Sequence, residues 1–302
     1  MTEQQPLVSI VIPCYNHAQF VQETIQSVID QDYDNIELII IDDGSNDSSV
    51  EVIQEMIPAC EERFVRFEFR CRPNKGLSAT LNEGMAWSQG SYLGFCSSDD
   101  MYHPSKVNSQ IKYFLTHKEI NYCYTGAFIQ DDNNNILVKQ TEEINKPLTG
   151  NITFEDIFTF KQHFPVTGMY KTRFIIEDLK GFDENLSAED YDINLRIITL
   201  TKIGYIPQKL YYYRSPAAIG GARKRLPMRV DVSESHLNTI RKYKDNPAYR
   251  AALLEWNLRR FIYFSSYTET KIYALKGMFF SIPKVTNINY IKSLIKLVFI
   301  WK

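Results

Sequence analysis

The sequence lacks the segments that would place it across a membrane or among disulfide-rich exported proteins. No apolar run approaches the roughly 18 to 20 residues that span a bilayer. The polar start MTEQQP is followed by a short apolar run, so we expect no signal peptide and a cytoplasmic protein. The 5 cysteines are odd in number and never spaced as C-x-x-C, which predicts reduced, partly buried thiols rather than a zinc knuckle or a complete disulfide set.

Neither sign of charge dominates, because 34 basic side chains face 36 acidic ones and the formal net charge is −2. This balance gives no indication of a nucleic-acid partner. The charges are unevenly placed along the chain. Residues 1–110 hold 6 basic and 17 acidic side chains, whereas residues 226–302 hold 13 and 5. With 44% hydrophobic residues in 302, the composition is that of a folded globular protein with a sizeable core.

Several sequence motifs of nucleotide and hydrolase chemistry are missing. The chain contains neither G-x-G-x-x-G after its first apolar run nor G-x-x-x-x-G-K-[ST], and it lacks H-E-x-x-H and G-x-S-x-G. Dinucleotide-dependent hydride transfer, phosphate-loop hydrolysis, zinc proteolysis and serine hydrolase chemistry are therefore disfavoured. Carboxylates remain as the main candidates for chemistry.

The first 110 residues alternate strand-length apolar runs with segments of helical period. Residues 7–12 and 36–41 are apolar runs typical of strands buried on both faces. Between them, Val21, Ile25 and Val28 form a helical stripe. The pattern predicts an α/β fold with a doubly wound, mostly parallel sheet, in which ligands bind at the carboxyl ends of the strands.

The later residues change in character. We expect a helix over residues 189–200 and two short strands at 205–206 and 210–213. From about residue 226 the pattern is mostly helical, with a break at Pro283. These changes suggest three segments, namely residues 1–110, 111–225 and 226–302.

Two pairs of acidic residues follow predicted strands, and two acids begin a predicted helix. Asp42 and Asp43 precede a Gly-Ser turn, so they either face a ligand or cap the turn and the next helix; Asp42 is the better candidate for a ligand. Asp99 and Asp100 suit a hard divalent cation that bridges to phosphates, or else a solvated loop. Helix capping is the simpler interpretation of Glu189 and Asp190, because the helix dipole favours acids at its start.

Several of these blocks carry a family resemblance. VSIVIPCYN at 8–16, ELIIIDDGSNDSS at 37–49 and NKGLSATLNEGMAWSQGSYLGFCSSDD at 74–100 resemble, in order and spacing, the nucleotide-sugar half of family 2 glycosyltransferases. GFDENLSAEDYDINLRI at 181–197 and LYYYR at 210–214 look like the acceptor half of the same family. The resemblance covers roughly two thirds of the chain, residues 7 to 215.

The resemblance implies a GT-A fold with a smaller acceptor-binding region, and inverting sugar transfer from a nucleoside diphosphate, with UDP favoured. The implied catalytic base is Asp190, paired with Glu189. The implied metal ligand is Asp99, followed by Asp100, and the cofactor is Mn²⁺ or Mg²⁺. The implied nucleotide-sugar contacts are Pro13, Tyr15, Asp42, Asn74, Lys75, Ser98 and Arg214.

Two features complicate this assignment. The family often has an additional acid at the start of the metal loop, where this chain has Ser97. Arg214 is placed either near the diphosphate or in an ion pair with Asp190 or Asp192. His103 and His163 are alternative candidates for a base or a ligand, but neither has a partner at metal-ligand spacing, so each is better explained as a structural residue.

The C-terminal residues combine basic and apolar side chains. From Lys271 to Lys302 there are six lysines and no acid, and Ile291, Leu294, Ile295 and Val298 recur at helical spacing. Such a helix either docks on the protein's own core or contacts an anionic membrane on the cytoplasmic side, and the second is favoured because lipid-linked acceptors lie there.

Three function classes remain. The first is an inverting sugar transferase acting on a glycan or lipid-linked acceptor in cell-surface polysaccharide synthesis. The second is a nucleotide-sugar-binding module without transfer activity, suggested by Ser97. A nucleotidyltransferase ranks last, because PCYNH at 13–17 is not a glycine-rich basic loop.

Overall fold

The computed structural model describes residues 5–215 and 228–299. The described chain divides into two compact units. The first consists of 1–151, 164–184 and 196–224, and the second of 152–163, 185–195 and 225–302. Because each unit is built from separate stretches of chain, the units do not follow the order of the sequence. The three-segment division stays a prediction.

The first unit is built on an eight-stranded sheet in the order β3-β2-β1-β4-β7-β6-β8-β5. Four strand pairs are parallel, β1 with β2, β1 with β4, β2 with β3 and β6 with β8, and the other three are antiparallel. The expected mostly parallel α/β sheet is confirmed. Its strands are β1 Val8–Cys14, β2 Ile36–Asp42, β3 Arg66–Cys71, β4 Tyr92–Phe95, β5 Met101–Tyr102, β6 Tyr122–Gln130, β7 Met169–Lys171 and β8 Ile203–Arg214.

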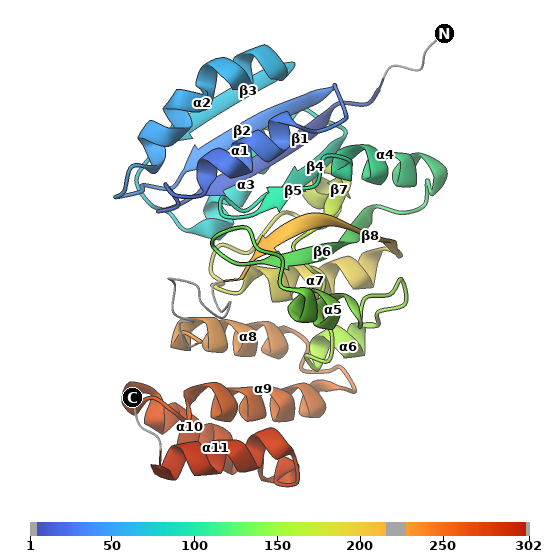
Figure 1. Ribbon diagram of the computed structural model, residues 1–302. Coiled ribbons are helices and arrows are strands. Elements are labelled where there is room, and N and C mark those ends of the chain that lie inside the picture. The colour runs from blue at the N-terminus through green and yellow to red at the C-terminus, as the bar shows by residue number, and fades with distance from the viewer. Residues whose placement is uncertain (1–4, 216–227, 300–302) are drawn as a thin grey trace. The chain divides into compact units, whose positions relative to one another are not determined.

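Helices connect the strands and cover the sheet. In α1, the stripe of Val21, Ile25 and Val28 is fully buried, as its spacing predicts, and Figure 1 shows α1 and α2 running across the front of the sheet. Strands β1 and β2 are buried on both faces because helices lie over them. The remaining elements of this unit are α2 Ser49–Arg63, α3 Leu77–Trp87, α4 Lys106–Thr116, α5 Val138–Asn145 and the π-helix η1 Phe174–Asp178, with α1 spanning Val21–Ile29.

The expectation of two short strands near residue 210 was wrong, because β8 is continuous from Ile203 to Arg214. Pro207 and the polar residues after it interrupt the apolar pattern in the sequence. In the structure, shifts in register around Gly126 of β6 absorb this interruption. The ladder resumes at Phe128, which pairs with Tyr212, and continues to Gln130 and Arg214. Arg214 is thereby fixed at a strand end.

The second unit is helical. It contains α6 Phe154–Phe158, the start of α7 Glu189–Leu200, α8 Val230–Lys242, α9 Tyr249–Phe264, η2 Thr268–Thr270, α10 Lys271–Phe280, η3 Ile282–Lys284 and α11 Ile288–Phe299. The predicted break at Pro283 is confirmed by η3. Phe261 and Phe264 of α9 form a core with Tyr290 and Leu297 of α11. At Gly277 a Cβ atom would lie 2.7 Å from the backbone nitrogen of Phe261, so α10 packs closely on α9.

The five cysteines are free thiols, as expected; four are buried and Cys71 is exposed. Burial raises the pKa of Cys14 to about 11 and that of Cys60 to about 12, which keeps both thiols protonated and unreactive at neutral pH. Among the described residues, no helix is both long and apolar enough to cross a bilayer.

Candidate active site

The candidate site lies at the sheet edge where β1, β2 and β4 end. From β1 the chain passes to β2 on one side, whereas β4 lies on the other side of β1, so the strand order reverses here. Hydrogen bonds join the loops after these strands. Asn16 donates from its backbone to Ser45 Oγ at 2.8 Å, and the Asn46 backbone donates to Asn16 Oδ1 at 2.7 Å. A ligand bound at this edge would contact loops that are held together by hydrogen bonds.

Asp42 and Asp43 have different surroundings at the end of β2. The Asp42 carboxylate accepts bonds from the Ser45 backbone at 2.9 Å and from Ser45 Oγ at 2.5 Å. It therefore caps its own turn, which Gly44 closes with φ +76°. Asp43 is bonded to the Arg72 side chain and to the backbone nitrogens of Lys75 and Gly76 at 2.8 and 2.9 Å. Asp43 thus positions the loop that carries Lys75.

The predicted nucleotide contacts on the outer loops remain accessible. The Tyr15 side chain is 45% exposed at the end of β1, and Pro13 beside it is partly exposed. Asn74 and Lys75 are exposed on the loop between β3 and α3. Their placement leaves an aromatic ring and a cation available at the same edge of the sheet. Nucleotide contact by these residues stays a prediction.

Hydrogen bonds from β8 and from α1 hold the loop after β4, and the residues of this loop differ in exposure. Asp100 is buried and accepts bonds from the Arg214 backbone at 2.7 Å and from the Tyr211 hydroxyl at 2.9 Å. On the other side, Thr24 Oγ1 of α1 donates to the carbonyls of Ser98 and Asp100 at 3.0 and 2.7 Å. Burial and the neighbouring Asp99 charge raise the pKa of Asp100 well above its ordinary value.

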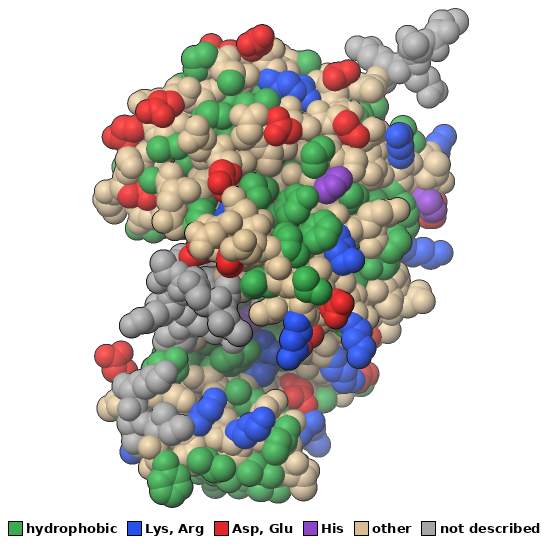
Figure 2. Space-filling model, viewed as in Figure 1, with side chains coloured by type: hydrophobic (Ala, Val, Ile, Leu, Met, Phe, Trp, Pro, Cys, Tyr) green, Lys and Arg blue, Asp and Glu red, His purple; other side chains and the backbone are tan. Residues whose placement is uncertain are grey.

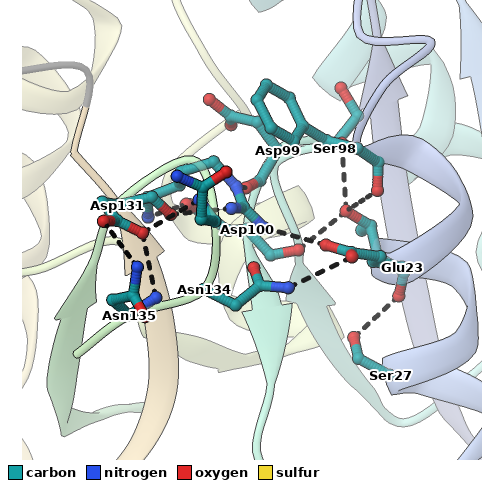
Figure 3. Close-up of polar contacts among 12 residues, drawn as sticks. Glu23, Ser27, Ser98, Asp99, Asp100, Asp131, Asn134 and Asn135 are labelled. Atoms are coloured by element: carbon teal, nitrogen blue, oxygen red, sulfur yellow. Dashed lines mark hydrogen bonds and ion pairs between the residues drawn. The ribbon is translucent and has the colours of Figure 1, made fainter. Parts of the chain in front are cut away.

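The Arg214 side chain is almost wholly buried, although it is charged. Its guanidinium donates to the Asp99 carbonyl at 2.8 Å, to the Asp131 carbonyl at 2.8 Å and to the Glu23 carboxylate at 3.1 Å. Figure 3 shows the turn from Asp131 to Asn135 on one side of Asp100 and Glu23 on the other. Arg214 pairs with Glu23, and its bonds favour a positioning role. The expected contact with a diphosphate stays a prediction.

Asp99 and His17 lie close together, a contact that was not predicted from the sequence. His17 Nδ1 lies 2.7 Å from Ser98 Oγ, and His17 Nε2 lies 3.9 Å from the Asp99 carboxylate, whose side chain is 18% exposed. Ser98 itself is buried. His17 follows Tyr15 and Asn16 directly after β1. Its position near the carboxyl end of a strand was the sequence signal that could have identified it as a site residue. His103 instead lies 3.0 Å from Ser105 Oγ and stacks on Tyr212, as a structural residue would.

The side chains of this loop suit a divalent cation for which the protein supplies only some of the ligands and the substrate supplies the others. Within residues 5–215 and 228–299, no three His, Cys, Asp or Glu side chains gather as a metal cluster. Asp99 is partly exposed, whereas both oxygens of Asp100 accept hydrogen bonds from the protein. Mg²⁺ is commonly held through one or two carboxylates together with substrate phosphates, so Asp99 suits such an ion better than Asp100. Metal binding by either residue stays a prediction.

The candidate base lies in the second unit, at the start of α7. Asp190 is exposed and accepts a bond from the Tyr191 backbone at 2.7 Å. Glu189 beside it is largely buried; burial, and then the charge of Asp190, raise its pKa to about 7. The start of α7 is fixed by the Tyr191 hydroxyl, which donates to the Phe158 carbonyl at 2.8 Å, and by the Ala188 backbone, which donates to Ser235 Oγ at 3.0 Å.

His163 lies near Asp190 in the same unit. Burial lowers the pKa of His163, while the Asp190 charge acts in the opposite direction. A neutral imidazole at neutral pH results, which is consistent with a structural residue. Glu189 and Asp190 therefore differ in environment, with one carboxyl buried and one open to solvent.

Comparisons with known proteins identify the family of this chain. The model of the family "Glycosyl transferase family 2" matches residues 9–177. An uncharacterized glycosyltransferase of Haemophilus influenzae is 35% identical over 138 residues, covering 46% of this chain and 54% of that protein. The Bacillus subtilis protein TuaG, named for teichuronic acid biosynthesis, is 31% identical over 126 residues, covering 42% and 48%. The chain thus spans about half the length of these two relatives.

The fold is also found among solved structures. S. aureus TarS, residues 1–349, in complex with UDP-GlcNAc has a TM-score of 0.66 with this chain at 16% identity. The likeness covers 96% of this chain and 88% of the TarS chain. The expected GT-A type of fold, with a helical C-terminal segment, is confirmed.

Proposed function

Since the chain belongs to glycosyl transferase family 2 and is a glycosyltransferase, we propose that it transfers a sugar, with inversion, from a UDP-linked donor to a hydroxyl of a glycan or lipid-linked acceptor. The observation that carries this proposal is the edge at β1, β2 and β4, whose loops are joined by hydrogen bonds and where the Asp99 side chain is 18% exposed while Asp100 is buried. The TarS complex with UDP-GlcNAc supports UDP as the donor nucleotide.

In this proposal the donor binds along the ends of β1, β2 and β4. The Tyr15 ring and Pro13 line the base, Asp42 accepts a bond from the nucleoside, and Lys75 reaches the diphosphate with Asn74 beside it. Three Asp42 bonds already come from its own turn, so the nucleoside bond is an additional one. A carboxylate accommodates it, because its two oxygens offer about four lone-pair sites.

A divalent cation, Mn²⁺ or Mg²⁺, would be held by Asp99 together with the donor's phosphates. When bound, such an ion stabilises the negative charge that develops on the departing diphosphate. Asp100 and Arg214 fix the backbone of the loop on which Asp99 stands. Ser98, whose hydroxyl contacts His17, contributes to the same loop.

Asp190 is the proposed general base. Its carboxylate is exposed, so it is accessible to an acceptor hydroxyl, from which it would take the proton as that oxygen attacks the sugar. Glu189 would act on Asp190 as a neighbour whose charge depends on pH, since burial and the Asp190 charge raise its pKa to about 7. Attack on the face opposite the leaving diphosphate gives inversion at the anomeric carbon.

The biological setting proposed is cell-surface polysaccharide synthesis on the cytoplasmic side of the membrane. The match to TuaG supports this setting. The alternative is a nucleotide-sugar-binding module without transfer activity. Ser97 in place of a loop carboxylate favours that alternative, whereas the exposed Asp190 at a well-fixed helix start favours transfer.

The first test is a binding screen. UDP, GDP, CMP and dTDP, and their sugars, would be compared by calorimetry with Mn²⁺ and with chelator. We expect binding of UDP and a UDP-sugar that depends on metal, and we expect Asp99→Ala to remove that metal dependence. Unchanged affinity of Asp99→Ala with and without Mn²⁺ would contradict the metal assignment.

The second test separates transfer from binding. Asp190→Asn should lower turnover by a factor of about 10² to 10⁴ while leaving nucleotide affinity nearly intact, because only the proton acceptor is lost. The matched control is Asp192→Asn, two residues further along α7, where a buried carboxylate contacts Lys242. Turnover equal to that of the unchanged protein in Asp190→Asn would rule out Asp190 as the base.

A further inference from the structure

The C-terminal helices display apolar side chains on their outer surface. Eight of these residues are each more than half exposed, and we call them the C-terminal apolar face. Figure 2 shows hydrophobic side chains gathered over these helices. Soluble proteins rarely leave large contiguous apolar patches open, so the feature indicates a partner. The face consists of Ile272, Phe279, Phe280, Ile282, Ile288, Ile295, Val298 and Phe299.

Helix α11 is apolar on two opposite sides. Its inner side, with Tyr290 and Leu297, is buried in the core formed with α9. Since each residue turns the helix by about 100°, Ile288, Ile295 and Phe299 fall on the opposite side. Docking on the protein's own core, which the sequence left as an alternative, is therefore confirmed for the inner side. It leaves the outer side available for a second contact.

Helix α10 repeats this arrangement. Ala274 and Gly277 face α9 and are buried, and the close approach at Gly277 fixes the helix against Phe261. Ile272 and Phe279 lie on the other side, two turns apart, and are exposed. Both helices thus use small or aromatic residues for internal packing and present a second apolar row outward.

The charges on the C-terminal segment itself have one sign, although one of its lysines, Lys284, is paired with Glu255 of α9. Residues 271–302 contain six lysines and no acid, in a chain whose overall charge is −2. Lys276 of α10 and Lys292 of α11 are exposed. On α11, Lys292 falls about 40° from Ile288 around the helix axis, on its exposed side. An apolar surface flanked by lysines complements a bilayer whose headgroups are negative and whose interior is apolar.

We propose that the C-terminal apolar face binds the surface of an anionic lipid bilayer, with Phe279, Phe280 and Phe299 entering the boundary between headgroups and acyl chains and the lysines contacting the headgroups. The proposal goes beyond sugar transfer and does not depend on it. Its consequence for the protein is peripheral attachment to a surface on which a lipid-linked acceptor would be concentrated.

The test measures binding of the full-length chain to vesicles by co-sedimentation. Vesicles of phosphatidylcholine containing 30% phosphatidylglycerol would be compared with vesicles of phosphatidylcholine alone. We expect binding to the anionic vesicles that weakens as salt is raised. Phe279→Ser with Phe299→Ser should lower the partition coefficient at least about tenfold, because two aromatic rings leave the bilayer boundary.

The charge contribution is tested by Lys276→Glu with Lys292→Glu, which should weaken binding by at least about 25-fold, since each basic residue near the headgroups contributes about fivefold. The matched controls are Val65→Ser with Val138→Ser, equally exposed valines of the first unit, and Lys112→Glu with Lys139→Glu. Both control pairs should bind as the unchanged protein does, and circular dichroism would verify that every variant is folded.

Three outcomes would overturn the proposal. These are no binding by the folded chain, equal binding of all variants, and equal binding to anionic and neutral vesicles. Sedimentation of the free chain as a dimer that Phe279→Ser with Phe299→Ser dissociates, without vesicle binding, would assign the face to a second copy of the chain instead. Donor binding and turnover in solution, measured on the same variants, report on the transferase separately.

Discussion

Glu189 should make the stability of the protein depend on pH in a way that its replacement by glutamine removes. Burial and the Asp190 charge raise its pKa from 4.5 to about 7 in the folded chain. Between these two values the folded protein holds a proton that the unfolded chain has released. The free energy of unfolding therefore includes a contribution from protonated Glu189. This contribution is fully present below about pH 4.5 and is lost as the pH rises through 7, because the folded chain must then carry a partly buried charge. The shift corresponds to about 2 to 3 kcal/mol at pH 8, allowing for the partial exposure of the side chain.

Glu189→Gln keeps the shape of the side chain and cannot ionise. We therefore expect the variant to exceed the unchanged protein in free energy of unfolding by about 2 to 3 kcal/mol at pH 8 and by almost nothing at pH 4.5. Urea unfolding at several pH values, followed by circular dichroism, measures this difference. Asp190→Asn removes the smaller of the two causes of the raised pKa and should therefore reduce the pH dependence without abolishing it, because the burial of Glu189 remains. An advantage of Glu189→Gln that is the same at pH 4.5 and pH 8 would refute the argument.

Three other predictions follow from particular contacts. Arg214→Lys should lower the free energy of unfolding by about 2 to 4 kcal/mol, because a lysine replaces only part of the bonds to Asp99, Asp131 and Glu23; chemical denaturation measures it. His17→Asn should weaken binding of UDP with Mn²⁺ roughly tenfold in calorimetry, with stability nearly unchanged. Gly277→Val should lower the thermal midpoint by destabilising the packing of α10 on Phe261 by about 1 to 3 kcal/mol.

The regular parts of the fold could be predicted because their patterns are local. The apolar runs of β1 and β2 and the stripe of α1 repeat over one element, so no distant partner is needed to interpret them. The short strands β5 and β7 went unpredicted because two or three residues carry no period. Strand β8 was divided in two because the register shift that accommodates Pro207 depends on β6, some 80 residues earlier.

For the candidate site, too, the sequence predicted some features and not others. That Asp42 and Asp99 lie at or near strand ends followed from the sequence, because Asp42 comes directly after an apolar run and Asp99 follows another after Ser97 and Ser98. What each carboxylate contacts did not follow. Arg214 meets Glu23 across 191 positions, and His17 meets Ser98 across 81. Contacts of this kind are set by the order of strands in the sheet, which a single sequence does not state.

The proposed metal site on the loop after β4 has consequences for how donor and cation would bind. Ser97 supplies no charge, and both oxygens of the buried Asp100 accept bonds from β8, so the proposal assigns the ion to the partly exposed Asp99. One carboxylate and a nearby imidazole bind Mg²⁺ or Mn²⁺ weakly, because such ions require several more oxygen ligands. The diphosphate of the donor can provide those oxygens. Cation and donor should therefore each strengthen the binding of the other by the same factor, as linkage requires.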